Sequence, residues 1–217
     1  MTKLLDADSR LRKLCLLKPQ EKGYPRSVLS RFTRKVGQDK LNSIIEDKVI
    51  KLLKGNRSKQ IDIVLNASFI KAWSTRHPTN SQIGYSDPEA RVGRTGRSYA
   101  LDYIVHLSID SKTMLPLSCL FASANDNEKK HSLVILEKAK QVLKSSGARL
   151  RSLIADSQYS DGKIRAAAEK AVIPYPANQK PGDRNVLRVD KKFRTYGPED
   201  QKKEYHKRPP VEAVNSS

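Results

Sequence analysis

Asp156 is the side chain in this sequence that is best placed to do chemistry. It directly follows a short apolar run, residues 150–155, and precedes a polar turn, residues 157–162. A helix-forming segment at 163–170 and a second apolar run at 172–175 complete the strand, turn, helix, strand order of a parallel β-pair. A carboxylate at the end of such a strand points into the crevice where open α/β sheets bind ligands. The alternative is that Asp156 caps the turn or the following helix.

The elements that must position Asp156 follow from hydrophobic spacing. Helical spacing predicts helices at 27–36, 41–53 and 127–146. Runs rich in β-branched and aromatic residues predict strands at 60–70, 99–110 and 115–122, the last two forming a hairpin. The order is then helices, β, ββ, α, β, α, β and a last helix. Three strands before the first crossover helix predict an α/β fold of the RNase H-like type, with a mixed sheet flanked by helices.

Polar residues fall at the positions where this fold gathers carboxylates around metal ions. The first strand carries Asp62 and Asn66, and Asp156 follows a later strand. Glu212 lies in the segment of the last helix. These residues come from three separate elements, as a metal site in such a fold requires.

The charge of the chain indicates a polyanionic partner. Lys and Arg number 42 against 23 Asp and Glu, which gives a net charge of +19 and a pI of about 10.0. Nucleic acid is the simplest such partner, and a generally basic protein is the alternative. About half of the excess lies in residues 1–59, which we expect to form a small basic helical N-terminal region before an RNase H-like domain at 60–217. Its two helices either bind DNA or merely pack on that domain.

Residues 75–98 are expected to form a long loop because Pro and Gly recur in them. Arg91, Arg94 and Arg97 make this loop basic, and we expect them to contact DNA. No apolar run approaches the length of about 18 residues that a membrane span needs, and no signal peptide is visible. The spacing of the histidines does not fit a zinc finger. Cys15 and Cys119 have no CxxC partner and are expected to be buried thiols in a reducing cytoplasm.

Further motifs occur in a fixed order along the chain. Residues 155–159 read Ala-Asp-Ser-Gln-Tyr, and Tyr205, Arg208 and Glu212 follow with two and three residues between them. Shorter landmarks are found at residues 86–91, 106–110, 115–117 and 124–125. Over about residues 15–215 the chain thereby resembles insertion-sequence DDE transposases, of the bacterial and archaeal group related to insertion sequences four and five.

The resemblance implies a DNA transposase that cleaves and transfers DNA strands in transposition and recombination. It places Asn66, Asp156 and Glu212 at the catalytic positions, with Asp156 and Glu212 as ligands of Mg²⁺ or Mn²⁺. Tyr205 and Arg208 would position DNA phosphates, or alternatively form an ordinary surface pair. The implied partner is double-stranded DNA at the terminal repeats of the element, bound in the cytoplasm at the nucleoid, and a homo-oligomer in a synaptic complex is compatible with this function.

Asn66 departs from the family pattern, which has an aspartate at this place in the strand. In-line cleavage of a phosphodiester with two divalent ions about 4 Å apart depends on anionic oxygen ligands. An asparagine offers one neutral carbonyl oxygen instead. Asp62 shares the face of Asn66 but is expected roughly 13 Å away along the strand, too far to replace the missing aspartate.

The C-terminal end departs from the family pattern as well. The chain stops at Ser217, two residues before the position of a signature Lys. The Pro-Pro pair at 209–210 lets a helix begin only near its second proline, so Tyr205 and Arg208 are expected to precede the helix of Glu212. We therefore expect a degenerate or truncated copy with impaired activity.

Three alternatives stay open at this point. The chain could be a non-catalytic DNA-binding remnant that occupies element ends. It could be an RNase H-like nuclease that uses Asp156, Glu212 and a single ion. It could also be a structural nucleic-acid binder that is unrelated to transposition.

Overall fold

A computed structural model of the chain describes residues 26–55, 58–72, 87, 90–95, 98–179, 181–183, 185–192 and 194–208. Cys15, Arg97 and Glu212 lie outside these residues. The chain divides into two compact units, residues 1–48 and 49–217. The domain boundary after residue 59 stays a prediction.

The described part of the first unit is helical. Helix α3 (Arg26–Val36) and helix α4 (Gln38–Lys54), which runs on into the second unit, are separated by Gly37 with a φ of 81°. Both helices and the turn were predicted. The apolar spacing of α4 does not describe one buried face, because Val49 and Leu53 are buried whereas Ile44 and Ile45 are exposed.

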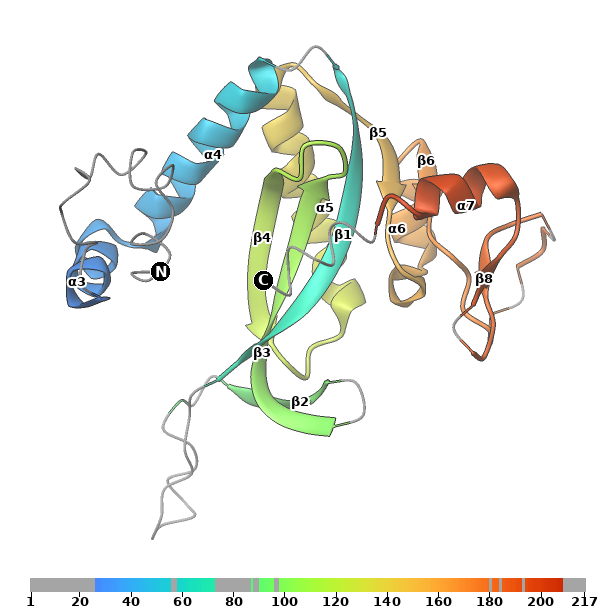
Figure 1. The fold of residues 1–217 in the computed structure, drawn as a ribbon, viewed down its shortest axis with the longest axis horizontal. Coiled ribbons are helices and arrows are strands. Elements are labelled where there is room, and N and C mark those ends of the chain that lie inside the picture. The colour runs from blue at the N-terminus through green and yellow to red at the C-terminus, as the bar shows by residue number, and fades with distance from the viewer. Residues whose placement is uncertain are drawn as a thin grey trace, which may run out of the picture. The chain divides into compact units, whose positions relative to one another are not determined.

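The second unit is built around a six-stranded sheet (Figure 1). Its strands are β1 (Gln60–Lys71), β2 (Arg91–Thr95), β3 (Ser98–Asp110), β4 (Pro116–Ser123), β5 (Arg149–Ile154) and β6 (Lys170–Val172). Strand β1 pairs antiparallel with β3 on one side and parallel with β5 on the other. Strand β4 pairs antiparallel with β3, and β6 pairs parallel with β5. The order β4-β3-β1-β5-β6 is the RNase H-like arrangement, so the predicted fold class is confirmed.

Strand β2 corrects the prediction of an uninterrupted loop at 75–98. It pairs with the first residues of β3, from Arg91 opposite Asp102 to Thr95 opposite Ser98. Gly93 looks like a loop residue in the sequence, but here it allows a close approach of two chain segments. A Cβ atom at this position would lie 2.4 Å from the carbonyl oxygen of Ala124.

The stretch after β4 folds largely as predicted. Helix α5 (Glu128–Ser146) begins at Asn127, whose side chain accepts a hydrogen bond from the backbone N–H of Lys129, and ends at Gly147 with a φ of 75°. After β5 come a short 3₁₀ helix η1 (Ser157–Tyr159) and helix α6 (Gly162–Ala166). Helix α6 is shorter than predicted because residues from Lys170 onward pair with β5 as strand β6.

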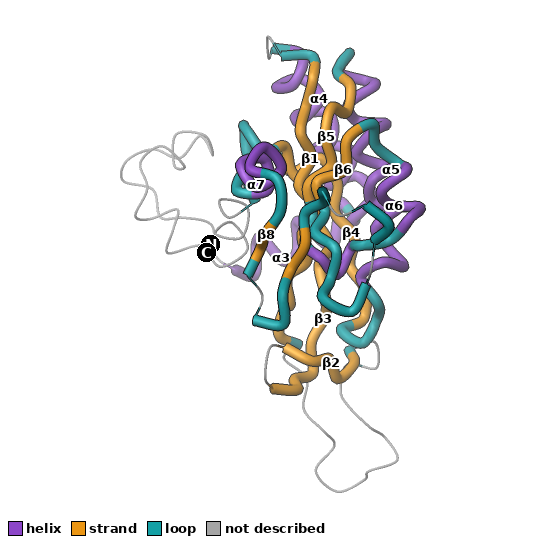
Figure 2. Tube along the Cα trace, turned by 90° about the vertical axis from the view of Figure 1, so that its right-hand side faces the viewer, coloured by secondary structure: helices purple, strands orange, loops and turns teal. Residues whose placement is uncertain are grey.

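The two faces of the sheet have different covers. Figure 2 shows α5 and α6 on one side of the strands and the C-terminal helix on the other. The α5 side holds the larger apolar core, which includes Ile63, Leu65, Leu136 and Leu153. Each such buried side chain contributes about 1.5–3 kcal/mol to the free energy of unfolding. This packing fixes the direction in which the alternate residues of β1 and β5 point.

The opposite face carries a smaller apolar cluster and the C-terminal elements. A short hairpin, β7 (Arg188–Val189) and β8 (Thr195–Tyr196), leads to helix α7 (Glu199–Tyr205). Val64, Ile154 and Leu187 are buried together on this face, and Tyr205 packs against them. The last residue of α7 therefore packs against β1 and β5.

Cys119 is a residue of strand β4. Cys119 is exposed, so the prediction of a buried thiol at this position is wrong. Cys119 pairs with Leu107, which packs against the smaller cluster, whereas the buried Leu117 belongs to the larger core. The irregularity in the β3–β4 pairing between Ser108 and Ile109 therefore places these two side chains, two residues apart, on opposite faces of the sheet. None of the described helices is long and apolar enough to cross a membrane.

Candidate functional site at the ends of the central strands

Asn66 on β1 and Asp156, two residues beyond the end of β5, each follow a paired residue of these neighbouring parallel strands. Val64 of β1 is paired with Ile154 of β5, and each polar residue lies two positions further along its strand direction. Asp156 itself has an extended backbone, with φ −77° and ψ 176°. Because side chains two residues apart in extended chain share a face, both polar side chains belong to the face of the smaller apolar cluster. The register therefore predicts that the first and second site positions lie side by side, just beyond the last paired residues.

Asp156 also caps the turn that follows it. Its Oδ1 accepts a hydrogen bond of 2.8 Å from the backbone N–H of Gln158, at the start of η1. Capping was the alternative explanation of this residue, and the structure contains that contact. A carboxylate has about four acceptor positions on two oxygens, so a single capping bond does not by itself exclude a ligand. The cap holds the carboxylate at a fixed place beyond the end of β5.

Tyr205 and Arg208 lie on the same face of the sheet. Arg208 Nη1 donates to the phenolic oxygen of Tyr205 at 2.5 Å, and its guanidinium carbon is 5.5 Å from the ring centroid. Tyr205 belongs to the apolar cluster of Val64 and Ile154, the residues two positions before Asn66 and Asp156. Tyr205 and Arg208 therefore lie on the face of the sheet to which the side chains of Asn66 and Asp156 are assigned.

Tyr205 is the last residue of helix α7, a helix that the sequence did not predict. The expectation that Tyr205 and Arg208 precede the helix of Glu212 stays a prediction, because Glu212 lies outside the described residues. Arg208 follows in a turn, with its backbone N–H bonded to the carbonyl of Tyr205 at 3.1 Å. A proline after Arg208 disfavours helical angles at that residue, which explains why the helix ends where it does.

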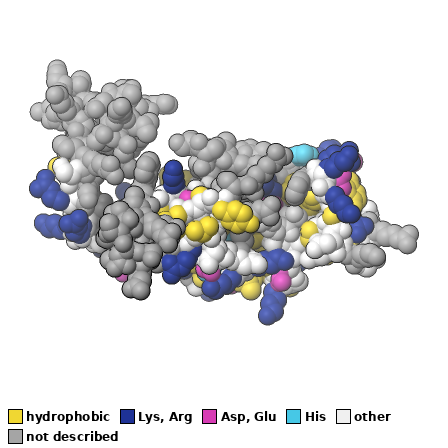
Figure 3. All heavy atoms as spheres, turned by 90° about the horizontal axis from the view of Figure 1, so that it is seen from below, with side chains coloured by type: hydrophobic (Ala, Val, Ile, Leu, Met, Phe, Trp, Pro, Cys, Tyr) yellow, Lys and Arg dark blue, Asp and Glu magenta, His cyan; other side chains and the backbone are white. Residues whose placement is uncertain are grey.

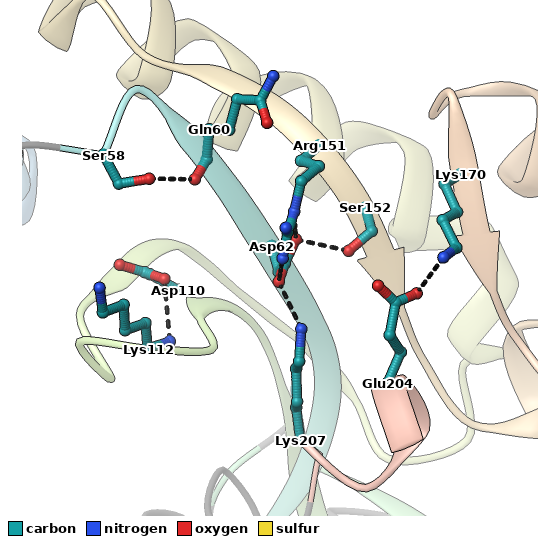
Figure 4. A network of polar contacts seen from close by, with 10 residues as sticks. All are labelled: Ser58, Gln60, Asp62, Asp110, Lys112, Arg151, Ser152, Lys170, Glu204 and Lys207. Atoms are coloured by element: carbon teal, nitrogen blue, oxygen red, sulfur yellow. Dashed lines mark hydrogen bonds and ion pairs between the residues drawn. The ribbon is translucent and has the colours of Figure 1, made fainter. Parts of the chain in front are cut away.

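Asp62 is occupied by structural contacts. Its carboxylate is 7% exposed and accepts hydrogen bonds from Arg151, Ser152 and Lys207 (Figure 4). Burial acts to raise the pKa of Asp62, but these hydrogen bonds outweigh it and hold the pKa well below its usual range. Asp62 is therefore an ionised ion-pair partner, not a replacement for the missing aspartate at Asn66.

The donor set determines which metal site the chain can form. Within the part of the chain that the structure describes, no three His, Cys, Asp or Glu residues are grouped to hold an ion. Asp156 supplies one carboxylate and Asn66 one neutral amide oxygen, while Glu212 lies outside the described residues. A pair of divalent ions needs more anionic oxygen than this. The described residues alone do not fit a two-ion centre.

The predicted basic loop can be located only in part. Arg91 is an exposed residue of β2, and its Nη1 donates to the carbonyl of Ala90 at 3.0 Å. Arg94 lies on the same strand, and Arg97 falls outside the described residues. Their contact with DNA stays a prediction. Figure 3 shows Lys and Arg side chains at several places on one face of the molecule.

Sequence reasoning did not identify the contact between the buried His106 and the half-buried His131. The imidazole of His106, on β3, is 1% exposed. Its ring centroid is 5.2 Å from that of His131, whose Nε2 lies 2.9 Å from Asp126. Burial, with a smaller effect of His131, lowers the pKa of His106 to about 4. These groups come from β3, α5 and the turn between β4 and α5, so only the folded chain brings them together.

Sequence reasoning also did not identify the contact between Asp87, in the landmark at 86–91, and Tyr103. Both carboxylate oxygens of Asp87 lie 2.7 Å from the hydroxyl of Tyr103, which donates to them from β3. This bond fixes one residue of the segment before β2 to the sheet. The sequence showed the landmark but not its partner.

Comparisons with known proteins show which family the chain belongs to. No curated protein sequence matches the chain. Among solved structures, the chain is similar to the Mos1 transposase in a paired-end complex with the left transposon end, with 12% identity and a TM-score of 0.31. That match covers 76% of this chain and 53% of the other, so this chain spans about half of that chain's length. The model of the family described as transposase DDE domain matches residues 58–216, and the chain therefore belongs to the transposase DDE domain family.

Proposed function

We propose that this chain is a DNA transposase of the group related to insertion sequences four and five, and that its strand-cleaving activity is impaired. The observation that supports the proposal is the register of β1 and β5, which pairs Val64 with Ile154, two residues before Asn66 and Asp156, on the face where Tyr205 packs. The position next to the second aspartate is the one at which the family pattern has its first aspartate. An asparagine there retains the shape of the site but removes one negative charge.

The proposed partner is double-stranded DNA at the terminal repeats of the element. The net charge of +19 provides attraction to phosphates that does not depend on sequence. Arg208 and the basic residues of β2 are the described groups proposed to contact DNA, and Arg208 is already oriented by its bond to Tyr205. A homo-oligomer in a synaptic complex and a location at the nucleoid in the cytoplasm belong to the same proposal.

The proposed cofactor is Mg²⁺ or Mn²⁺, with Asp156 and Glu212 as ligands. A divalent ion supplies charge stabilisation for the attacking and leaving oxygens of a phosphodiester. Asn66 contributes a dipole where a carboxylate would contribute a full negative charge, so ion affinity is reduced. The neutral side chain of Asn66 also favours a second candidate function, a non-catalytic protein that binds element ends.

An end-cleavage assay separates these functions. The substrate is duplex DNA that carries the terminal repeats flanking the gene, and a shuffled duplex of equal length is the control. We expect preferential binding of the terminal-repeat duplex, little cleavage with Mg²⁺ or Mn²⁺, and more cleavage by the Asn66→Asp variant. Absence of binding at low salt would contradict the DNA-binding proposal. Robust cleavage by the unmodified chain, abolished by Asp156→Ala, would show that Asn66 does not impair the site.

A further inference from the structure

The buried carboxylate of Asp62 ties the C-terminal segment to the sheet. Its oxygens accept from Arg151 Nε at 2.6 Å, Ser152 Oγ at 2.7 Å and Lys207 Nζ at 2.9 Å, and Arg151 Nη2 also binds Oδ2. Figure 4 shows Lys207 reaching Asp62 from the C-terminal segment, while Arg151 and Ser152 reach it from β5. One side chain of β1 thereby joins three parts of the chain.

We propose that Asp62 is a positioning residue, which holds Tyr205 and Arg208 over the strand ends by fixing Lys207. This inference rests on the proposed function, because it assigns Asp62 a part in presenting the DNA-contacting pair. Asp62 lies four residues before Asn66 on β1, and its place in the site is that of a partner to Lys207. It acts through the chain that follows α7.

The short distance along the chain makes this coupling direct. Lys207 lies between Tyr205 and Arg208, and the turn that contains them is closed by backbone hydrogen bonds. Lys207 N–H donates to the carbonyl of Glu204 at 3.1 Å, and Arg208 N–H donates to that of Tyr205 at 3.1 Å. Fixing the ammonium group of Lys207 therefore restricts the orientation of Arg208.

Helix α7 needs such external ties. It has seven residues, and isolated helices shorter than about 12–15 residues are marginal in water. A second tie comes from Glu204, whose carboxylate lies 2.7 Å from Lys170 Nζ on β6. Packing of the half-buried Tyr205 against the apolar cluster adds a third. Asp62 is the most buried of the charged groups in these ties, so its loss should affect the segment most.

The matched controls come from the same helix. Glu199 pairs with Lys202, three residues away on α7, and Glu199 is 76% exposed. Glu199→Gln therefore changes the net charge as Asp62→Asn does, without loosening the helix from the sheet. Lys203 is exposed on α7, so Lys203→Met is the matched control for Lys207→Met.

The first measurement is hydrogen exchange of the full chain, read by mass spectrometry without DNA. In Asp62→Asn and in Lys207→Met, exchange in residues 199–208 should accelerate on the order of tenfold or more, whereas exchange in α5 stays unchanged. Lys207→Met leaves Arg151 and Ser152 on Asp62, so it tests the tie even if Asp62→Asn fails to fold. The two control variants should match the unmodified chain.

The second measurement is the affinity for the terminal-repeat duplex relative to the shuffled duplex. The preference should fall in Asp62→Asn and Lys207→Met, persist in both controls, and recover in part in Asp62→Glu. Unchanged exchange in 199–208, or equal acceleration throughout the chain, would overturn the positioning role. Accelerated exchange in 199–208 with an unchanged preference would overturn the functional part. If the unmodified chain has no preference to lose, the proposed function fails, and the exchange data still decide whether Asp62 fixes the segment.

Discussion

Replacing His106 by leucine should make the stability of the fold less sensitive to weak acid. The imidazole is 1% exposed, and neither of its ring nitrogens has a hydrogen-bond partner among the described residues. Burial lowers its pKa to about 4, whereas the unfolded chain has the usual value of about 6.5. Between these values the unfolded state binds a proton that the folded state does not, so the free energy of unfolding decreases as pH falls.

The size of the effect follows from the two pKa values. One pH unit in this window is worth about 1.36 kcal/mol, so the full window corresponds to roughly 3 kcal/mol, a large part of the 5–15 kcal/mol of a typical domain. Leucine cannot bind a proton, and it also removes the cost of two buried polar nitrogens without partners, about 1–3 kcal/mol. We therefore expect His106→Leu to be at least as stable as the unmodified chain near neutral pH and clearly more stable near pH 5.

Urea unfolding at several pH values between about 7 and about 5 measures this slope directly. His206→Leu is the control, because His206 is exposed at the end of α7. The control should retain the pH dependence of the unmodified chain. If His106→Leu has the same slope as the unmodified chain, burial of the neutral imidazole is not the cause. Asp126 and His131 would then be the next groups to test.

Three further results are expected. Gly93→Ala should lower the free energy of unfolding by about 1–3 kcal/mol, because the added Cβ would meet the backbone of Ala124. Gly182→Ala is the control and should be near neutral, because no atom lies within 4 Å of the added Cβ. Urea unfolding measures both variants, and equal free energies of unfolding would refute the close approach at Gly93. Leu136→Ala, at a fully buried position of α5, should cost about 2–5 kcal/mol by the same assay, and a loss near zero would contradict the assigned core. Affinity for a random duplex, measured at two salt concentrations, should fall by roughly 0.9 log units per log unit of salt for each phosphate contact, and a salt-independent affinity would contradict an electrostatic origin.

Most of the fold can be predicted from the sequence because its elements have local signals. Alternation and apolar runs indicated the five strands of the RNase H-like order, and Asn127 and Gly147 marked the ends of α5. Strand β2 was missed because Gly93 and its arginine neighbours are typical of loops, and its pairing depends on β3. Helix α7 was missed because its seven residues have no apolar period and are held by contacts with distant strands.

The candidate site could be predicted only where it depends on strand order. The strands that lead to Asn66 and Asp156, β1 and β5, are neighbours in the sheet, and this follows from the order of elements. The ion pair between Asp62 and Lys207 could not be inferred, since the two residues are 145 positions apart along the chain. The same holds for His106 and His131, whose contact depends on how α5 packs on β3.

Divalent-ion affinity of the Asn66→Asp variant tests the central claim most directly. If Asn66 and Asp156 form one site that lacks a carboxylate, the substitution should tighten Mn²⁺ binding on the order of tenfold or more, because it adds a full negative charge beside Asp156. Titration calorimetry of the unmodified chain, Asn66→Asp, and Asn66→Asp combined with Asp156→Ala measures this gain and its dependence on Asp156. We predict that the gain appears in the single variant and is lost in the double variant. Equal affinity of Asn66→Asp and the unmodified chain, or a gain that persists without Asp156, would contradict the account.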